Sequence, residues 1–400
     1  MWNRFDLWCE SCGYVLPEDK LAAVSSMGTM SGVCPSCDRA LLNARYDMRA
    51  DRFLHWQEKL KNREGNLWRY RELLPLPQAK RAVSFGEGWT PLIRLERFGG
   101  AIGLENLYYK DERQNPTATF KDRQATVAIS FLKEQGIKEI VLASTGNVAI
   151  AYSAYAARAG MQVYAFFPDG VAEAKIREAS LYGAKVMAVA GSYDEAKAAA
   201  AQFASDRCLF LDQGIKTFAG VESMKTMGFE IAEQLGWSSP DWYIQGVSGG
   251  MGPVGVAKGF LELKTLGFVD KIPALGLIQS AGCAPIAQSF QRGETTVSPV
   301  NSPETAIATL ATGNPGIAYT LLKQHLDTFG GGCATVTDEE AWAMVQKLAT
   351  TEGLLVEPAT AVTFAGTVKL AQQGRIQPQE TVVINCSGRE KDVASIVLSP

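Results

Sequence analysis

Several features that mark common classes of protein are scarce in this chain. Histidine occurs only twice in 400 residues, at His55 and His325, in stretches without other catalytic signatures, so we expect both to be structural. No apolar run reaches the roughly 20 residues that cross a bilayer, and no signal-peptide region opens the sequence. The net charge of −3 provides no basic field for nucleic acid. The sequence therefore predicts a cytoplasmic protein that acts on a small molecule, without membrane or nucleic-acid partners.

Cysteine is also too sparse and too unevenly placed for a disulfide scaffold. Four of the eight cysteines form two Cys-x-x-Cys pairs, Cys9/Cys12 and Cys34/Cys37, within a zinc-ribbon-like segment predicted over 1–45. The two-residue spacing lets each pair turn both sulfurs toward one tetrahedral ion, and four cysteine ligands leave no open position for catalysis. The sequence thus predicts structural zinc, with four unrelated free thiols as the alternative.

The chain is long enough for two or three structural units, and its segments differ in composition. Residues 46–80 are charged and aromatic, which predicts a helical arm. Beyond them, short apolar runs alternate with amphipathic stretches, the pattern of βα units and a parallel sheet. Predicted strands start at Ile140, Val163, Ala184, Trp242, Ala274 and Thr381, with helices over 148–159, 172–181 and 193–203.

Ligands of open α/β sheets bind at the carboxyl ends of strands, so the turns that follow the predicted strands are candidate sites. One turn, Ser144-Thr145-Gly146-Asn147, precedes a helix whose free N–H groups favour an anion, although a plain helix cap is the alternative. A second turn holds Ser248, Gly249, Gly250, Met251 and Gly252, where successive N–H groups can converge on a phosphate. A third turn spans 385–392. The second turn lacks the Gly-x-Gly-x-x-Gly spacing of dinucleotide-binding proteins, which excludes a dehydrogenase.

A lysine completes the set of candidates. Lys121 lies in Asn115-Pro-Thr-Ala-Thr-Phe-Lys-Asp-Arg, a turn that leads into a predicted helix over 124–135. Desolvation or a neighbouring positive group would lower the pKa of such an amine, as Schiff-base formation requires. Taken alone, a lysine at a helix start is more often a solvated surface charge.

The lysine segment resembles the cofactor-lysine motif of threonine synthases, Asn-Pro-Thr-Gly-Ser-Phe-Lys-Asp-Arg. Other motifs also occur in the order of that family. Glu87-Gly-Trp-Thr-Pro-Leu lies upstream of the lysine segment, and after it come Ser144-Thr-Gly-Asn147, the glycine-rich loop 248–252, Glu357-Pro-Ala and a final Ser-Gly-Arg with Lys391-Asp392. The resemblance covers nearly the whole chain from Cys9 to Asp392.

The resemblance implies a fold-type II enzyme dependent on pyridoxal 5'-phosphate, with two three-layer α/β domains, the cofactor in the cleft between them and the zinc ribbon in front. We expect a small mobile domain over 119–214 and a large cofactor-binding domain over 46–118 and 215–400. Homodimers and a place in amino-acid biosynthesis are further implications of the resemblance.

The same resemblance assigns roles to residues. Lys121 would form the Schiff base and, once freed, move protons. Residues 144–147 would hold the substrate α-carboxylate, and Asn147 would also donate to the ring oxygen of the cofactor. Residues 248–252 would bind the cofactor phosphate. Ser387 would face the pyridine nitrogen, because the ending from Ser387 to Asp392 resembles that of tryptophan synthase β chains more than that of threonine synthases. Cys386 is the alternative, because an ungapped match to threonine synthases places their threonine there.

The resemblance fails in one segment. Threonine synthases carry Asn-Pro-x-Arg-x-Glu-Gly-x-Lys-Thr, in which asparagine and arginine hold the phosphate of O-phosphohomoserine; here Glu222, Lys225 and Thr226 match, but Gly220 replaces the arginine. A buried phosphate needs charged partners, and Lys216 is one candidate. The lysine motif also differs, with Ala118 and Thr119 for glycine and serine.

These observations predict a lyase of the threonine synthase type that eliminates or replaces a group at the β or γ carbon of a small, optionally O-phosphorylated amino acid. Threonine synthase itself is the leading activity. β-Elimination or β-replacement on serine, threonine or an activated serine in specialised metabolism is the alternative. A non-catalytic binding protein with the same fold is the remote third reading.

Overall fold

The computed structural model describes residues 5–17, 33–37, 40–76 and 81–390, which form two compact units. The first unit holds the described residues up to Trp89 together with Lys121–Thr226, and the second holds Thr90–Phe120 and the described residues from Met227 onward. The described residues of 46–89, which we predicted as part of the large domain, lie in the same unit as 121–226.

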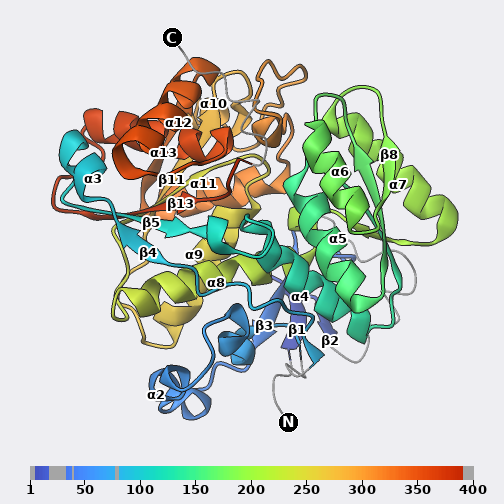
Figure 1. The fold of residues 1–400 in the computed structure, drawn as a ribbon. Helices are drawn as coiled ribbons and strands as arrows, with labels where there is room; N and C mark the ends of the chain where they lie inside the picture. Colours follow the sequence, from blue (N-terminus) through green and yellow to red (C-terminus); the bar gives the residue numbers. More distant parts are fainter. Residues whose placement is uncertain (1–4, 18–32, 38–39, 77–80, 391–400) are drawn as a thin grey trace. The chain divides into compact units, whose positions relative to one another are not determined.

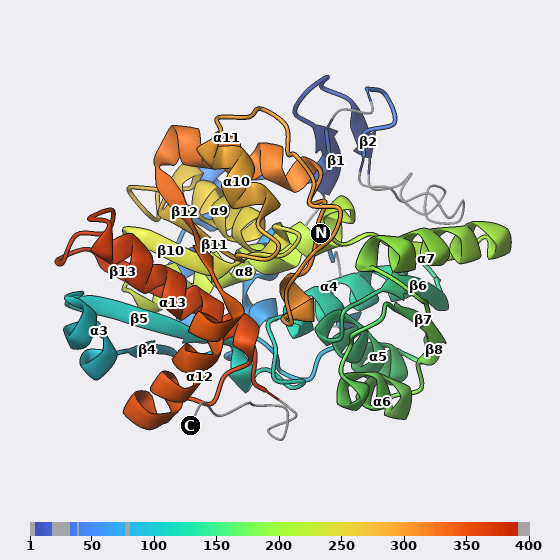
Figure 2. The same cartoon turned by 90° about the horizontal axis from the view of Figure 1, so that it is seen from above.

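A four-stranded parallel sheet forms the centre of the first unit. Its strand order is β8-β7-β6-β9, with bounds β6 Glu139–Ala143, β7 Gln162–Phe167, β8 Lys185–Ala188 and β9 Phe210–Asp212. Figure 2 shows one helix, α7 (Tyr193–Arg207), on one face and the others on the opposite face: α4 Lys121–Glu134, α5 Asn147–Ala159 and α6 Glu173–Leu181. The βα alternation predicted over this region is confirmed.

Sequence features explain why α7 begins and packs where it does. The Ser192 hydroxyl accepts from the Glu195 N–H while the Glu195 carboxylate accepts from the Ser192 N–H, a capping box that satisfies two free donors. Ala200 and Ala204 then pack on Val141 and Phe166 of the sheet. Alanine at these positions lets the helix approach the strands closely.

A three-stranded antiparallel sheet precedes these elements, in the order β2 (Val15–Pro17), β1 (Phe5–Cys9), β3 (Leu42–Tyr46). Three short helices follow: η2 Ala50–Phe53, α2 Trp56–Lys61 and η3 Leu67–Leu73. The predicted arm over 46–80 is therefore broken into short helices within its described part. Phe5 of β1 packs against Phe131 of α4 and Phe218, with ring centroids 6.5 and 6.0 Å away.

A six-stranded sheet forms the centre of the second unit, in the order β12-β11-β10-β13-β5-β4. Only the β4–β5 pair is antiparallel. The strands are β4 Leu92–Arg94, β5 Asn106–Asp111, β10 Trp242–Gly246, β11 Ala274–Ser280, β12 Gly331–Val336 and β13 Thr381–Cys386. The central strand β10 is almost wholly buried, as expected for a parallel sheet covered on both faces.

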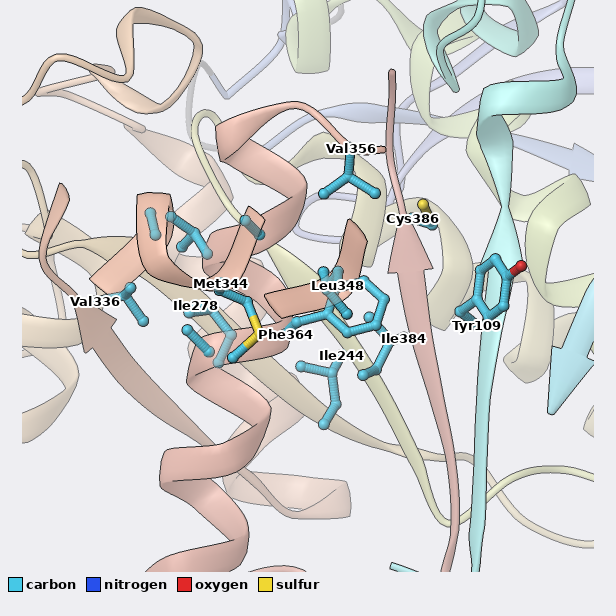
Figure 3. Packing of buried hydrophobic residues seen from close by; sticks show 14 of the residues in the cluster. Tyr109, Ile244, Ile278, Val336, Met344, Leu348, Val356, Phe364, Ile384 and Cys386 are labelled. Atoms are coloured by element: carbon cyan, nitrogen blue, oxygen red, sulfur yellow. The ribbon is translucent and has the colours of Figure 1, made fainter. Parts of the chain in front are cut away.

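The helices of the second unit cover both faces of this sheet (Figure 1). They are α3 Glu96–Ile102, α9 Met251–Thr265, α10 Pro285–Gln291, α11 Ile317–Phe329, α12 Asp338–Glu352 and α13 Pro358–Gln372, with short helices η5 Glu112–Gln114 and η7 Ala308–Leu310. Helix α8 (Phe218–Gln234) begins in the first unit, after η6 (Gly214–Lys216), and ends in the second. An apolar core lies under α12 and α13, where Phe364 and Leu348 meet Ile244 and Ile384 of the strands (Figure 3).

Candidate active site

The predicted cofactor lysine is the first residue of α4, three residues earlier than the predicted helix start. The segment before it is fixed to the chain beyond β13. Phe120 N–H donates to the Ser387 carbonyl at 3.0 Å, Arg389 N–H donates to the Ala118 carbonyl at 3.1 Å, and Thr119 forms a bridge with Gly388. Because Lys121 follows Phe120 directly, the backbone of Lys121 starts next to the residue that follows β13.

Ala118 has a left-handed backbone, with φ +60°. An L-residue with a Cβ pays roughly 1 kcal/mol for this conformation, and glycine does not. The threonine synthase motif carries glycine there, so the shape of the turn is preserved in this chain although the residue is not.

Ser387 and Cys386, the two candidates for the pyridine partner, lie in different surroundings. The Ser387 hydroxyl is 2.8 Å from the Thr360 hydroxyl and 3.4 Å from Glu357 Oε1. Cys386 is fully buried in the apolar core near Tyr109 and Ile384 (Figure 3), and burial raises the pKa of its thiol well above the ordinary value. Polar surroundings thus belong to Ser387. The matched Lys391 and Asp392 lie outside the described residues.

The glycine-rich turn links β10 to α9, and β10 is the direct neighbour of β13. Gly250 has φ +83°, and a Cβ there would lie 2.9 Å from the Ala318 side chain, so only glycine fits. A Cβ on Gly249 would meet nothing within 4 Å, which leaves open space beside this backbone. The first N–H groups of a helix have no partner within it, so the start of α9 supplies donors for an anion.

Ser248 in this turn is held by its side chain, since its hydroxyl lies 2.5 Å from the Thr312 hydroxyl. The open backbone at Gly249, the donors of the first turn of α9 and the polar Ser387 at the adjacent strand end together fit a phosphorylated heterocycle such as pyridoxal phosphate. This is the donor set that the cofactor requires.

The turn 144–147 joins β6 to α5 in the first unit. The buried Ser144 hydroxyl accepts from the N–H groups of Gly146 and Ala149, both at 3.0 Å, so this hydroxyl caps the helix. Gly146 has φ +128°, and a Cβ there would lie 2.5 Å from Cδ of Lys175, whose stem covers the turn. Thr145 is half-buried and Asn147 is buried at the first position of α5. The Ser144 hydroxyl thus holds the turn, and the aliphatic part of Lys175 packs against it.

The residues that match the substrate-phosphate segment of threonine synthases are buried in a structural cluster. Lys225 Nζ lies 2.5 Å from Glu222 Oε2, both side chains are at most 1% exposed, and the Tyr46 hydroxyl donates to the same oxygen at 2.7 Å. Lys225 also stands 4.0 Å from the centre of the Tyr46 ring, and the Thr226 hydroxyl accepts from Arg123. Lys216, considered above as a phosphate partner, is exposed in η6.

The four cysteines of the predicted ribbon come together. Their sulfurs all lie within 4.8 Å of one another, with Cys9 to Cys37 at 3.7 Å and Cys12 to Cys34 at 3.6 Å. These separations are too long for disulfides, and they approach the ~3.8 Å edge of a tetrahedron with zinc–sulfur bonds of about 2.3 Å. Burial raises the pKa of the Cys34 thiol to about 12. A cation would therefore be needed to hold the thiolate form, and the donor set fits zinc.

The two histidines lie apart from these groups of residues. Burial lowers the pKa of His325 in α11, and its Nε2 donates to the Pro273 carbonyl at 3.0 Å. His55 is exposed, beside Glu58. Among the described helices, none is long and apolar enough to cross a membrane.

One group was missed in the sequence. Asp212, the last residue of β9, accepts a hydrogen bond of 2.6 Å from the Tyr152 hydroxyl and is only 8% exposed. Its sequence signal is an acidic residue directly after the apolar pair Phe210-Leu211, at the end of a strand of three residues that the pattern did not show.

Comparison with known proteins gives a consistent result. Residues 83–388 match the family described as "Pyridoxal-phosphate dependent enzyme". The chain is 35% identical to the threonine synthase of Methanocaldococcus jannaschii, over 95% of this chain and 91% of that protein, and 36% identical to that of Methanosarcina acetivorans, over 96% and 91%.

Solved structures share the fold at lower identity. Tomato threonine deaminase isoform 2 superposes with a TM-score of 0.66 at 20% identity, covering 88% of each chain. Maize serine racemase gives the same score and identity, covering 76% of this chain and 89% of that one. The predicted α/β architecture is thereby confirmed.

Proposed function

Because the chain belongs to the threonine synthases within the pyridoxal-phosphate dependent enzymes, we propose that it is a lyase that uses Lys121 to eliminate or replace a group at the β or γ carbon of a small amino acid. Threonine synthase is the leading specific activity. The observation that carries the proposal is that β10 and β13 are neighbouring parallel strands, so their carboxyl ends lie side by side. The phosphate turn follows β10 and Ser387 follows β13. The hydrogen bond from Phe120 to Ser387 holds the residue before Lys121 at the same end of the sheet.

The roles of the residues follow from their chemistry. Pyridoxal phosphate supplies an electron sink for a carbanion next to its bound amine. In this proposal residues 248–252 hold its phosphate through backbone N–H groups, and the neutral Ser387 hydroxyl faces its ring nitrogen. Asn147 donates to its ring oxygen and the turn 144–147 binds the substrate carboxylate. The Lys121 amine takes a proton from the α carbon and returns one later.

A second candidate activity rests on Gly220. The side chain that should hold a substrate phosphate is absent at this position, and Glu222 and Lys225 are engaged with each other. If the leaving group is phosphate, Lys175, whose stem packs on Gly146, and Lys216 are our candidate cationic partners for it. Without them, the site suits β-elimination or β-replacement on serine, threonine or an activated serine.

Further parts of the proposal rest on local geometry or on the family resemblance. The separations of the four cysteine sulfurs support structural zinc. A small mobile domain over 119–214, a homodimer and a cytoplasmic location stay predictions from the sequence.

The test is stopped-flow absorbance of the cofactor-loaded protein, with Lys121→Ala and the surface control Lys133→Ala. Each is mixed with O-phosphohomoserine, threonine, serine and O-phosphoserine, and phosphate and keto acid are assayed. Threonine and phosphate from O-phosphohomoserine, lost in Lys121→Ala alone, would establish threonine synthase. Lys175→Gln and Lys216→Gln should then raise the KM for that substrate. A response to serine-type substrates only would establish elimination or replacement at the β carbon. A protein that binds no pyridoxal phosphate would refute the proposal that this chain is an enzyme.

A further inference from the structure

Asp212 is the last residue of β9, at the end of the four-stranded sheet where the turn 144–147 also lies. In the pairing of β6 with β9, Leu142 stands opposite Asp212. Two residues beyond Leu142 the chain enters the turn 144–147. The Asp212 carboxylate therefore occupies the carboxyl end of the sheet, where ligands of α/β folds bind.

The carboxylate is buried and fixed. Oδ2 accepts from the Tyr152 hydroxyl at 2.6 Å, and Oδ1 accepts from the Gly214 N–H at 2.8 Å. Tyr152 is itself fully buried in α5, and its hydroxyl also interacts with the Gln124 side chain. Gln124 lies three residues after Lys121, on the same side of α4. Two hydrogen bonds thus set the position of the acid, and the tyrosine joins it to the helix that begins with Lys121.

Three titratable groups interact electrostatically with this acid. Lys121 of α4 attracts it, while Tyr152 of α5 and Tyr193 of α7 are neutral hydroxyls beside it. Burial raises the pKa of Asp212, and the Tyr152 and Gly214 hydrogen bonds and the Lys121 charge oppose that rise. Burial and then the Asp212 charge raise the pKa of Tyr193 to about 12, so this hydroxyl keeps its proton near neutrality.

A carboxylate in such a place needs a cation, because an isolated buried charge costs several kcal/mol. Lys121 supplies this positive charge whenever its amine is protonated and is not bonded to the cofactor. We propose that Asp212, held by Tyr152, is a positioning residue for Lys121: it acts as counter-ion to the ammonium form and so sets the pH at which the amine becomes a base. This inference rests on the proposed function, in which the same amine moves the α proton.

The proposal makes a direct prediction about Lys121 without any cofactor. An adjacent anion favours the ammonium form, which does not react with electrophiles. Removing the anion should free the amine at lower pH. In Asp212→Asn we expect labelling of Lys121 in cofactor-free protein at pH 7.5 to rise about tenfold, equal to a fall of about one pH unit in its titration midpoint.

The experiment is competitive labelling with dinitrofluorobenzene between pH 6 and 11, with Lys121 and Lys133 quantified in the same digest by mass spectrometry. Lys133 is the internal reference on the same helix. Asp194→Asn removes an exposed carboxylate from the same unit and should leave the midpoint of Lys121 unchanged. Asp212→Glu retains the charge and should restore most of the wild-type midpoint.

Tyr152→Phe keeps the carboxylate but removes a hydrogen bond that favours its ionised form. It should shift the Lys121 midpoint in the same direction as Asp212→Asn, by less, and it carries the test if Asp212→Asn does not fold. A wild-type midpoint in every variant would overturn the proposal and leave Asp212 as a structural partner of Tyr152. Because the labelling needs no turnover, a protein without lyase activity would refute the proposed function and still give a readable midpoint.

Discussion

The buried pair of Glu222 and Lys225 allows a quantitative prediction. Lys225→Met removes the cation and leaves a carboxylate that is 1% exposed. A carboxylate in that position takes up a proton instead, and protonating a glutamic acid at pH 7.5, from an ordinary pKa of about 4.3, costs about 4 kcal/mol. This agrees with the roughly 3–5 kcal/mol found when one partner of a buried ion pair is removed. We therefore expect Lys225→Met to lower the free energy of unfolding by about 4 kcal/mol.

The loss should depend on pH. In the variant the folded protein holds a proton on Glu222 more tightly than the unfolded chain does, so stability is present at low pH and is lost as the pH rises. At pH 5.5 the same proton costs only about 1.6 kcal/mol. Lys225→Met should therefore be closer to the wild type at pH 5.5 than at pH 7.5, by about 2.5 kcal/mol.

Urea unfolding followed by tryptophan fluorescence at the two pH values measures this difference. The double variant Lys225→Met, Glu222→Gln lacks both charges of this pair and retains an acceptor for Tyr46, so it should return to within about 1 kcal/mol of the wild type. Lys197→Met is the matched control, since Lys197 pairs with Asp194 three residues away and lies over the Tyr193 ring, but its side chain is 39% exposed. It should cost less than about 1 kcal/mol. A small or pH-independent loss in Lys225→Met would refute the reasoning.

Three further predictions concern other sites. Ala118→Gly should raise the free energy of unfolding by about 1 kcal/mol, because the left-handed backbone no longer opposes a Cβ; denaturant titration measures this. Purified protein should carry one zinc per chain by elemental mass spectrometry, and Cys34→Ser should lose the metal and unfold at a lower temperature, whereas the exposed Cys208→Ser should not. Below about pH 6.5 the unfolded chain protonates His325 while the folded protein resists, so acidification to pH 5.5 should destabilise the wild type by up to about 1 kcal/mol more than His325→Asn.

Much of the fold could be predicted from the sequence because its signals are local. The strands β6, β7 and β10 are apolar runs, and the capping box at Ser192 marks a helix start within a few residues. The lysine motif and the two cysteine pairs are also contained in short stretches of sequence. Short strands such as β9 were missed, because three residues are too few to show the alternation of apolar and polar residues that marks a strand.

Side-chain roles set by distant contacts could not be predicted in the same way. The sequence shows that Glu222 and Lys225 match a substrate-binding segment, but their burial against Tyr46 depends on a strand 176 residues away. The choice between Ser387 and Cys386 likewise depends on which residue faces the apolar core. The partners of Asp212 lie in α4 and α5, far from it in the sequence, so no local motif predicts its role.

The position of β13 has a consequence for how the chain is made. This strand lies between β10 and β5, although it starts about 270 residues after β5 ends. At roughly 5–20 residues per second a ribosome needs about 15 to 55 seconds to add that length. During this time β5 presents an unpaired strand edge to other nascent chains, and β10 does so from its own synthesis onward, because the strand that separates them does not yet exist. The four-stranded sheet of the first unit is contiguous in sequence and can form within this interval, whereas the six-stranded sheet of the second unit is incomplete until β13 has been translated.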